Sequence, residues 1–203
     1  MNSKLIGLLA LACWPAAVFA APETFDFKDP KGVNNAVFKL DAPLEAVTGS
    51  ASGISGSATF DPENPAATQG KIVVTSASLT VPNPMQNQHL HGPMWLDAAG
   101  FPDITFAAKE LKNVKTEGEV TTADATGTFT LKGVSKELTI PVRLTYLKDK
   151  LQARVPNQKG DLLVIRANFT IKRSDFNIMP GKMEEKVSDA IDLTLSIAGA
   201  APR

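Results

Sequence analysis

The chain has few of the residues that usually carry catalysis or hold metals. Its 203 residues include one cysteine, Cys13, and two histidines, His89 and His91. A single cysteine excludes the disulfide-stapled secreted folds. We find no Gly-x-Ser-x-Gly nucleophile motif and no glycine-rich phosphate loop in front of a helix. We therefore expect neither a hydrolase of that type nor a nucleotide-binding enzyme, and we expect no cofactor.

Long apolar runs are also scarce, and the exception lies near the start of the sequence. Residues 5–12 form an apolar run after a lysine, and residues 18–20 (Val-Phe-Ala) have the small-x-small pattern of a cleavage site. This predicts a cleaved secretory signal peptide over residues 1–20, too short to span a membrane, and a periplasmic domain over 21–203. Lipid modification of Cys13 is the second interpretation, which fits the surrounding residues less well.

Net charge is close to zero, with 21 basic and 21 acidic residues, and no basic cluster stands out. Nucleic acid is therefore not an expected partner. Without the predicted signal peptide the chain has no cysteine, so an ordinary hydrophobic core must hold the domain together. A chain of this length is sufficient to bury such a core.

Most of the sequence alternates apolar and polar residues with a period of two, which indicates β-strands. The clearest case is a hairpin over 126–142, in which Phe129 and Leu131 share one face and residues 133–136 form the turn. Residues 48–56, rich in Gly and Ser, predict a flexible or edge segment. Further strands are expected at residues 24–28, 35–41, 57–61, 71–81, 103–111, 161–175 and 186–198.

The pattern predicts one all-β domain of about eight antiparallel strands, with no internal repeat and no linker. Each strand has one apolar face. In residues 71–81, the alternation assigns Val73 and Leu79 to one face and Ile72 and Val74 to the opposite face. Such strands can close as a sandwich or as a barrel, and a barrel of this size can hold one small ligand. Many inward residues are small, which leaves room and favours a barrel with a cavity.

The stretch 89–106 departs from this alternation. It groups Met94, Trp95 and Leu96, followed by Phe101, between Gly-Pro and Gly-Phe-Pro sequences. Proline suits the first turn of a helix, so we expect a short helical turn that starts at Pro93. We interpret the stretch as a compact apolar plug set between the strands. Its aromatic residues belong to the core by default, and the sequence alone cannot separate a core residue from a ligand wall.

The two histidines have three interpretations. His89 and His91 could chelate a metal if the segment is extended, but no third ligand is evident nearby. One of them could instead anchor the plug by a hydrogen bond to the backbone. In the third interpretation, His89 lies at a pocket mouth and touches a polar ligand head.

Arg173 is the single residue that stands out most clearly. By strand parity it continues an apolar face and points inward, and Asp189 also points inward. A structural ion pair between Arg173 and Asp189 would satisfy both charges, and we rank this role first. The rival role is contact with an anionic ligand head such as a pyrophosphate, which suits the planar guanidinium group.

Several ordered motifs give the chain a family resemblance. They are residues 56–61 (Gly-Ser-Ala-Thr-Phe-Asp), 86–90 (Gln-Asn-Gln-His-Leu), 95–97 (Trp-Leu-Asp), 101–106 (Phe-Pro-Asp-Ile-Thr-Phe), 127–136 (Gly-Thr-Phe-Thr-Leu-Lys-Gly-Val-Ser-Lys) and 172–176 (Lys-Arg-Ser-Asp-Phe). In these residues the chain resembles the YceI-like family of exported, lipocalin-like lipid-binding proteins. It departs from the family pattern at Lys172, Asn177 and Gln86, where asparagine, glycine and arginine are usual.

The resemblance implies an up-and-down, lipocalin-like β-barrel with an interior channel and no enzymatic activity. The ligand that it implies is a long apolar lipid of the isoprenoid, quinone or fatty-amide type. The chain has Gln86 where the family usually has arginine, and the absence of this positive charge favours a neutral ligand head. The sequence leaves open whether the protein forms a homodimer or touches a membrane transiently. The candidate ligand-binding residues are Leu79, Met85, Asn87, His89, Leu90, Trp95, Leu96, Phe101, Phe106, Phe129, Phe169, Arg173 and Phe176.

Our leading hypothesis is a carrier in which a channel binds the lipid tail and the plug over 85–106 gates its mouth. Two alternatives remain. One is an envelope stress or interaction protein whose barrel is simply a packed core. The other is a hydrolase or metal protein centred on the two histidines.

Overall fold

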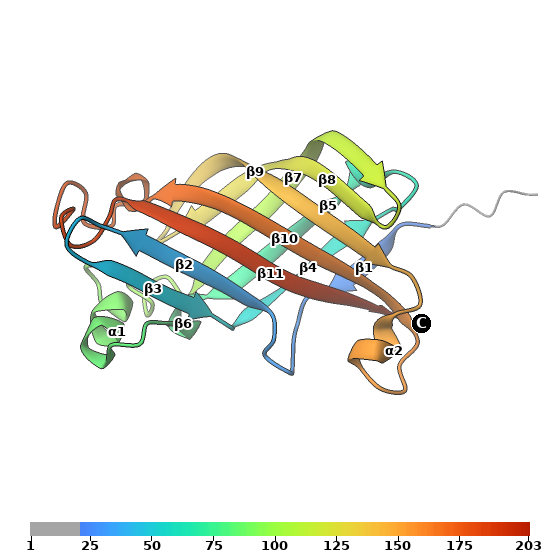
Figure 1. Ribbon diagram of the computed structural model, residues 1–203, viewed down its shortest axis with the longest axis horizontal. Helices are drawn as coiled ribbons and strands as arrows, with labels where there is room; N and C mark the ends of the chain where they lie inside the picture. Colours follow the sequence, from blue (N-terminus) through green and yellow to red (C-terminus); the bar gives the residue numbers. More distant parts are fainter. Residues whose placement is uncertain (1–20) are drawn as a thin grey trace, which may run out of the picture.

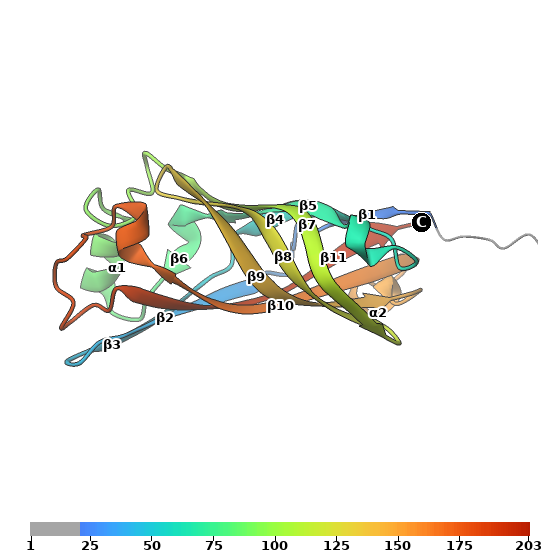
Figure 2. The same ribbon diagram turned by 90° about the horizontal axis from the view of Figure 1, so that it is seen from above.

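The computed structural model describes residues 21–203, so the predicted signal peptide and Cys13 lie outside the described residues. Within this range eleven strands form a single antiparallel sheet that curls around one long axis (Figures 1 and 2). The strands are β1 Glu23–Asp26, β2 Asn35–Asp41, β3 Ala46–Ala51, β4 Ile54–Phe60, β5 Gln69–Thr75, β6 Leu79–Thr80, β7 Asp103–Glu117, β8 Val120–Leu131, β9 Val134–Leu147, β10 Gly160–Lys172 and β11 Ala190–Pro202.

Eight of these strands close into a barrel. Their order is β1-β4-β5-β7-β8-β9-β10-β11, and β1 pairs back to β11 at Asp26 and Ala200. Beyond this closure, β11 pairs with β2, and β3 and β6 follow as an extension of the sheet. The predicted all-β, antiparallel, lipocalin-like barrel is therefore confirmed.

The hairpin β8–β9 shows how the local sequence sets the pairing. Lys132 and Gly133 form a two-residue turn, with φ values of 48° and 73°. Leu131 pairs with Val134 across this turn, so the turn is tighter and slightly earlier than the predicted 133–136. A Cβ on Gly133 would lie 2.5 Å from the Phe101 ring, so this position requires glycine for packing as well as for its backbone conformation.

Residues 71–81 do not form the single strand that the alternation predicts. β5 ends at Thr75, and a 3-10 turn, Ser76–Ser78, separates it from β6. The Ser76 hydroxyl donates to Phe101 O at 2.7 Å, which holds this turn against the segment before β7. The turn changes the parity of the chain, because Ile72 and Leu79 both face the interior although they are seven positions apart, an odd spacing that would put them on opposite faces of a regular strand. The predicted shared face of Val73 and Leu79 is wrong.

Residues 48–56 are also more regular than predicted, because they form most of β3 and the start of β4. Gly49 in β3 leaves room for the Phe38 ring, which a Cβ would approach to 2.2 Å. The high glycine content therefore serves close packing between neighbouring strands. β3 nevertheless lies in the extension outside the closed barrel.

The described residues include two short α-helices, which lie at opposite ends of the barrel (Figure 1). α1 spans Pro84–His91 and is capped by Asn83, whose Oδ1 accepts from Met85 N at 3.0 Å and Gln86 N at 3.1 Å. The predicted helical start at Pro93 is wrong, because the Asn-Pro cap occurs earlier and residues 92–100 form turns. α2 spans Leu151–Arg154. None of the helices between residues 21 and 203 has the length and apolar character needed to cross a membrane.

Candidate ligand cavity

The barrel interior contains a cavity of about 230 Å³. Its wall consists mainly of Val, Ile, Leu, Ala and Phe side chains from the inward faces of the strands. On β10, for example, Ile165, Ala167, Phe169 and Ile171 line the cavity in the period of two that the sequence predicts. At the α1 end of the barrel, Trp95 and other residues of the 90–96 segment complete the wall.

In the described part of the chain, few polar side chains reach this wall, and none of them is a carboxylate. The polar lining residues are Thr68, Thr105, Thr194 and Arg173. The hydroxyl of Thr68 donates to Pro65 O at 2.6 Å, and that of Thr194 donates to Asn168 Oδ1 at 2.8 Å. These bonds direct both hydroxyls to protein acceptors. The cavity therefore suits an apolar molecule.

The guanidinium of Arg173 is fully buried at the α1 end and is saturated with hydrogen bonds. A guanidinium has five N–H donors, and here each of them meets a backbone carbonyl. The acceptors are Ile178 O at 2.9 Å, Lys182 O at 2.5 Å, Ser188 O at 3.1 Å, Val187 O at 3.1 Å and Met179 O. Arg173 thus holds the 177–189 segment in place and keeps no N–H free for a ligand.

The predicted ion pair between Arg173 and Asp189 is wrong. The Asp189 carboxylate instead accepts from Ser174 N at 2.9 Å and from Ser174 Oγ at 2.8 Å. Between residues 21 and 203, no carboxylate lies within ion-pair distance of Arg173. The carbonyl dipoles and the Trp95 ring, 6.0 Å from the guanidinium carbon, solvate the buried charge in place of a carboxylate.

The structure places the thirteen candidate ligand-binding residues in two groups. Eight line the cavity: Leu79, Leu90, Trp95, Leu96, Phe106, Phe129, Phe169 and Arg173. The other five do not. Met85, His89 and Phe101 are exposed, and Phe176 is buried beside Phe129 with its ring centroid 5.5 Å away. The Asn87 Oδ1 accepts from Val81 N at 3.0 Å, which joins α1 to the end of β6.

The two histidines have separate positions. His91 Nε2 lies 2.8 Å from Leu79 O, so this ring anchors α1 to β6, as expected for one of the pair. His89 is exposed on the outside of α1. In the part of the chain that the structure describes, no three His, Cys, Asp or Glu side chains gather as a metal site would require.

The far end of the barrel contains residues that the sequence analysis did not single out. One buried cluster there contains Phe25, Phe27 and Phe60, and the partly buried Tyr146 packs against it. The cluster continues the cavity wall, because it also contains lining residues such as Leu144. The alternation of Phe25 and Phe27 was visible in the sequence, but their place on the cavity axis depends on the pairing of β1 with β11. They lie opposite the α1 end.

A polar network outside this cluster fixes the single tyrosine. The Tyr146 hydroxyl and the Arg203 guanidinium both donate to the fully buried Asp161, and Asp149 N donates to it at 2.7 Å. Burial alone would raise the pKa of Asp161, but these hydrogen bonds hold that pKa below its usual range. Burial and the nearby Asp161 carboxylate raise the pKa of Tyr146, so the hydroxyl stays protonated and donates.

Comparisons with known proteins agree with this architecture. A family model described as "YceI-like domain" matches residues 30–199. A UPF0312 protein of Enterobacter sp. (strain 638) is 33% identical over 144 residues, which cover 71% of this chain and 68% of that protein. A UPF0312 protein of Yersinia pestis (strain Pestoides F) is 34% identical over 151 residues, which cover 74% and 72%.

Solved structures share the fold. The Campylobacter jejuni YCEI protein has a TM-score of 0.62 at 25% identity, with 76% of this chain and 85% of that chain covered. BcnA of Burkholderia cenocepacia has a TM-score of 0.63 at 23% identity, with 81% and 94% covered. A polyisoprenoid binding domain from Saccharophagus degradans, implicated in plant cell wall breakdown, has a TM-score of 0.64 at 12% identity, with 90% and 100% covered.

Proposed function

Because the chain belongs to the YceI-like family, we propose that it is a non-enzymatic binding and carrier protein for a long apolar lipid. The lipid class is isoprenoid, quinone or fatty amide, and the site of action is the cell envelope. The polyisoprenoid binding domain from Saccharophagus degradans, which has the same fold, supports the isoprenoid choice.

One observation carries the proposal: the interior is a hollow whose wall is almost entirely apolar. On β10 the lining residues run from Ile165 to Ile171, a distance of about 20 Å at the usual rise per strand residue. An extended lipid tail fits such a space. Each buried methylene would contribute about 0.8 kcal/mol, so apolar burial alone can hold a long chain.

The ligand head is neutral in this proposal. Among residues 21–203, Arg173 is the one cation on the cavity wall, and its five donors already meet five carbonyls. A pyrophosphate or carboxylate head would have to break those bonds to reach the guanidinium. A quinone, amide or alcohol head avoids this cost, which agrees with the neutral head favoured by Gln86 in the sequence.

The 84–96 segment would gate entry. Asn87 and His91 tie α1 to β6 and its end, and Lys132 Nζ holds the same segment through Pro93 O at 2.9 Å and Met94 O at 3.3 Å. Leu90, Trp95 and Leu96 form the wall behind α1. A lipid that entered at this end would displace these side chains without unfolding the barrel. Movement of one short helix is a modest structural change for a carrier.

Analysis of the bound material tests the proposal most directly. We expect native mass spectrometry of the purified protein to show an added mass, and solvent extraction to release a neutral apolar lipid. Protein that carries no lipid and takes up none after extraction and incubation with a quinone would contradict the carrier function. N-terminal sequencing of protein from the cell envelope tests export, for which we expect a mature chain that begins at residue 21.

A further inference from the structure

We propose that four aromatic side chains at the α2 end of the barrel form the floor of the cavity and set the longest ligand tail that can be buried. These floor residues are Phe25, Phe27, Phe60 and Tyr146. The inference depends on the function proposed above and adds which residues decide the chain length of the ligand.

The cavity stops at one level on neighbouring strands. Ile165 of β10 pairs with Leu144 of β9, and both line the cavity. Two residues further toward the α2 end, Leu163 pairs with Tyr146, and neither of them lines it. Leu163 has no exposed surface at all, so packed side chains replace the hollow at this level.

The floor residues fill that level by matching large side chains with small ones. Phe25 and Phe27 are fully buried, and Phe60 is 2% exposed. The Tyr146 ring meets Phe25 edge-on with centroids 6.2 Å apart and lies 5.8 Å from Phe60. β8 contributes only the small Ala123 and Ala125 to the same cluster, which leaves space for these rings inside the barrel.

The floor is also held at a defined height. The backbone of Phe27 donates to Gly56 O at 2.9 Å and accepts from the side-chain amide of Asn34 at 3.0 Å. Its ring lies over Gly199, where a Cβ would come within 2.9 Å of Cζ. The Tyr146 hydroxyl is bound to Asp161. A ligand tail that reaches these rings therefore meets a fixed wall.

A fixed wall has a measurable consequence for affinity. While the tail still fits, each added methylene improves Kd about fourfold through apolar burial. Once the tail reaches the floor, further methylenes remain outside the cavity and add little. A plot of log Kd against chain length should therefore break at the length that matches the distance to the floor.

Neutral straight-chain alcohols of about eight to eighteen carbons provide such a series, because each member adds only buried methylenes. They would compete with the fluorescent probe N-phenyl-1-naphthylamine on protein freed of lipid by solvent extraction.

Two variants change the depth of the cavity. Phe60→Ala lowers the floor, and Ala125→Leu raises it from the opposite wall. Thr122→Leu adds bulk at an exposed position of the same strand and serves as the matched control.

We expect Phe60→Ala to move the break to chains longer by about two methylenes or more, because the surroundings fill such a cavity only partly. Ala125→Leu should move the break to shorter chains, and Thr122→Leu should leave it in place. A break that moves with neither cavity variant overturns the inference. The Ala125→Leu result decides the matter if Phe60→Ala fails to fold. A wild-type protein that binds no alcohol and no probe would refute the proposed function itself, and the floor with it.

Discussion

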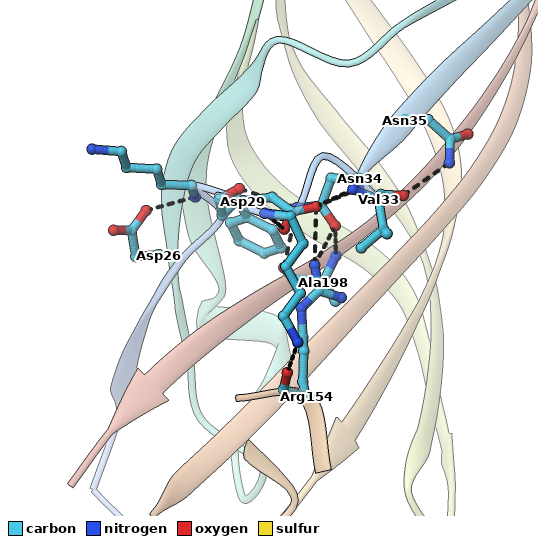
Figure 3. A network of polar contacts seen from close by, with 10 residues as sticks. Asp26, Asp29, Val33, Asn34, Asn35, Arg154 and Ala198 are labelled. Carbon is cyan, nitrogen blue, oxygen red and sulfur yellow. Dashed lines mark hydrogen bonds and ion pairs between the residues drawn. The ribbon is translucent and has the colours of Figure 1, made fainter. Parts of the chain in front are cut away.

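The side-chain amide of Asn34 pairs with the backbone of Ala198 as a neighbouring strand would. Its Nδ2 donates to Ala198 O at 3.2 Å, and its Oδ1 accepts from Ala198 N at 2.9 Å (Figure 3). On β11, Ala198 lies between Ala200, which pairs with β1, and Ser196, which pairs with β2. The amide therefore continues the hydrogen-bond ladder at the point where the partner strand changes.

We expect Asn34→Leu to lower the free energy of unfolding by about 2–4 kcal/mol, because several buried groups would lose their partners. These include Phe27 O, Ala198 N and Ala198 O. Urea denaturation would measure the change. Asn35→Leu is the matched control, since its amide bonds only Val33 O on the surface, and we expect it to change stability by less than about 0.5 kcal/mol. Equal losses in the two variants would contradict the ladder role.

Asp29 makes this corner of the barrel sensitive to acid. Its carboxylate accepts from Val33 N and Asn34 N, both at 2.6 Å, and pairs with Arg154 at 3.2 Å (Figure 3). Burial alone would raise the pKa of Asp29, but the backbone N–H donors and Arg154 hold the pKa below its usual value. Its contribution to stability is therefore complete above about pH 4 and is lost as pH falls through the depressed pKa.

We expect the free energy of unfolding to fall below about pH 4, and to fall less steeply in Asp29→Asn. Asp29→Asn should also be less stable at neutral pH, by about 1–3 kcal/mol, because an amide is a weaker acceptor for these donors. Unfolding curves recorded across the acidic range would measure both effects. Parallel pH profiles for the two proteins would show that another carboxylate is responsible.

Arg173→Met tests whether the guanidinium is structural. Removal of its donors leaves five backbone carbonyls of the 177–189 segment without these partners, so we expect a loss of about 2–4 kcal/mol and faster proteolysis in that segment. The neighbouring exposed Lys172→Met should change little. If Arg173→Met kept full stability but lost lipid uptake, the residue would act on the ligand instead.

The period of two in the sequence predicted the inward faces of the long strands well. The cavity is lined as expected by Phe129 and Leu131 on β8, and by alternate residues from Ile165 to Ile171 on β10. These strands are continuous and have one apolar face, so parity survives along their whole length. The β5–β6 region failed because the 3-10 turn Ser76–Ser78 resets the parity, and no alternation can show such a turn.

The environment of Arg173 could be predicted only in part. Strand parity indicated that its side chain points inward, and the structure buries it fully. Its partners are backbone carbonyls, which every residue has, so nothing in the composition of 178–188 marks them. An acidic neighbour such as Asp189 was the only partner that the sequence could suggest. The floor of the cavity was missed for a related reason, since it forms only when β1 closes the barrel.

Bulky substitutions on β10 distinguish a hollow interior from a packed one. Phe169 lines the cavity, whereas Leu163, on the same face of the same strand, lies in the packed level below it. We expect Phe169→Trp to cost less than about 1 kcal/mol and to weaken binding of N-phenyl-1-naphthylamine, because the larger ring occupies ligand space. We expect Leu163→Trp to cost about 1–3 kcal/mol through overpacking. Urea denaturation and probe titration measure the two effects. Equal destabilisation at both positions would mean that the barrel is filled throughout, and would favour an envelope stress or interaction domain over a lipid carrier.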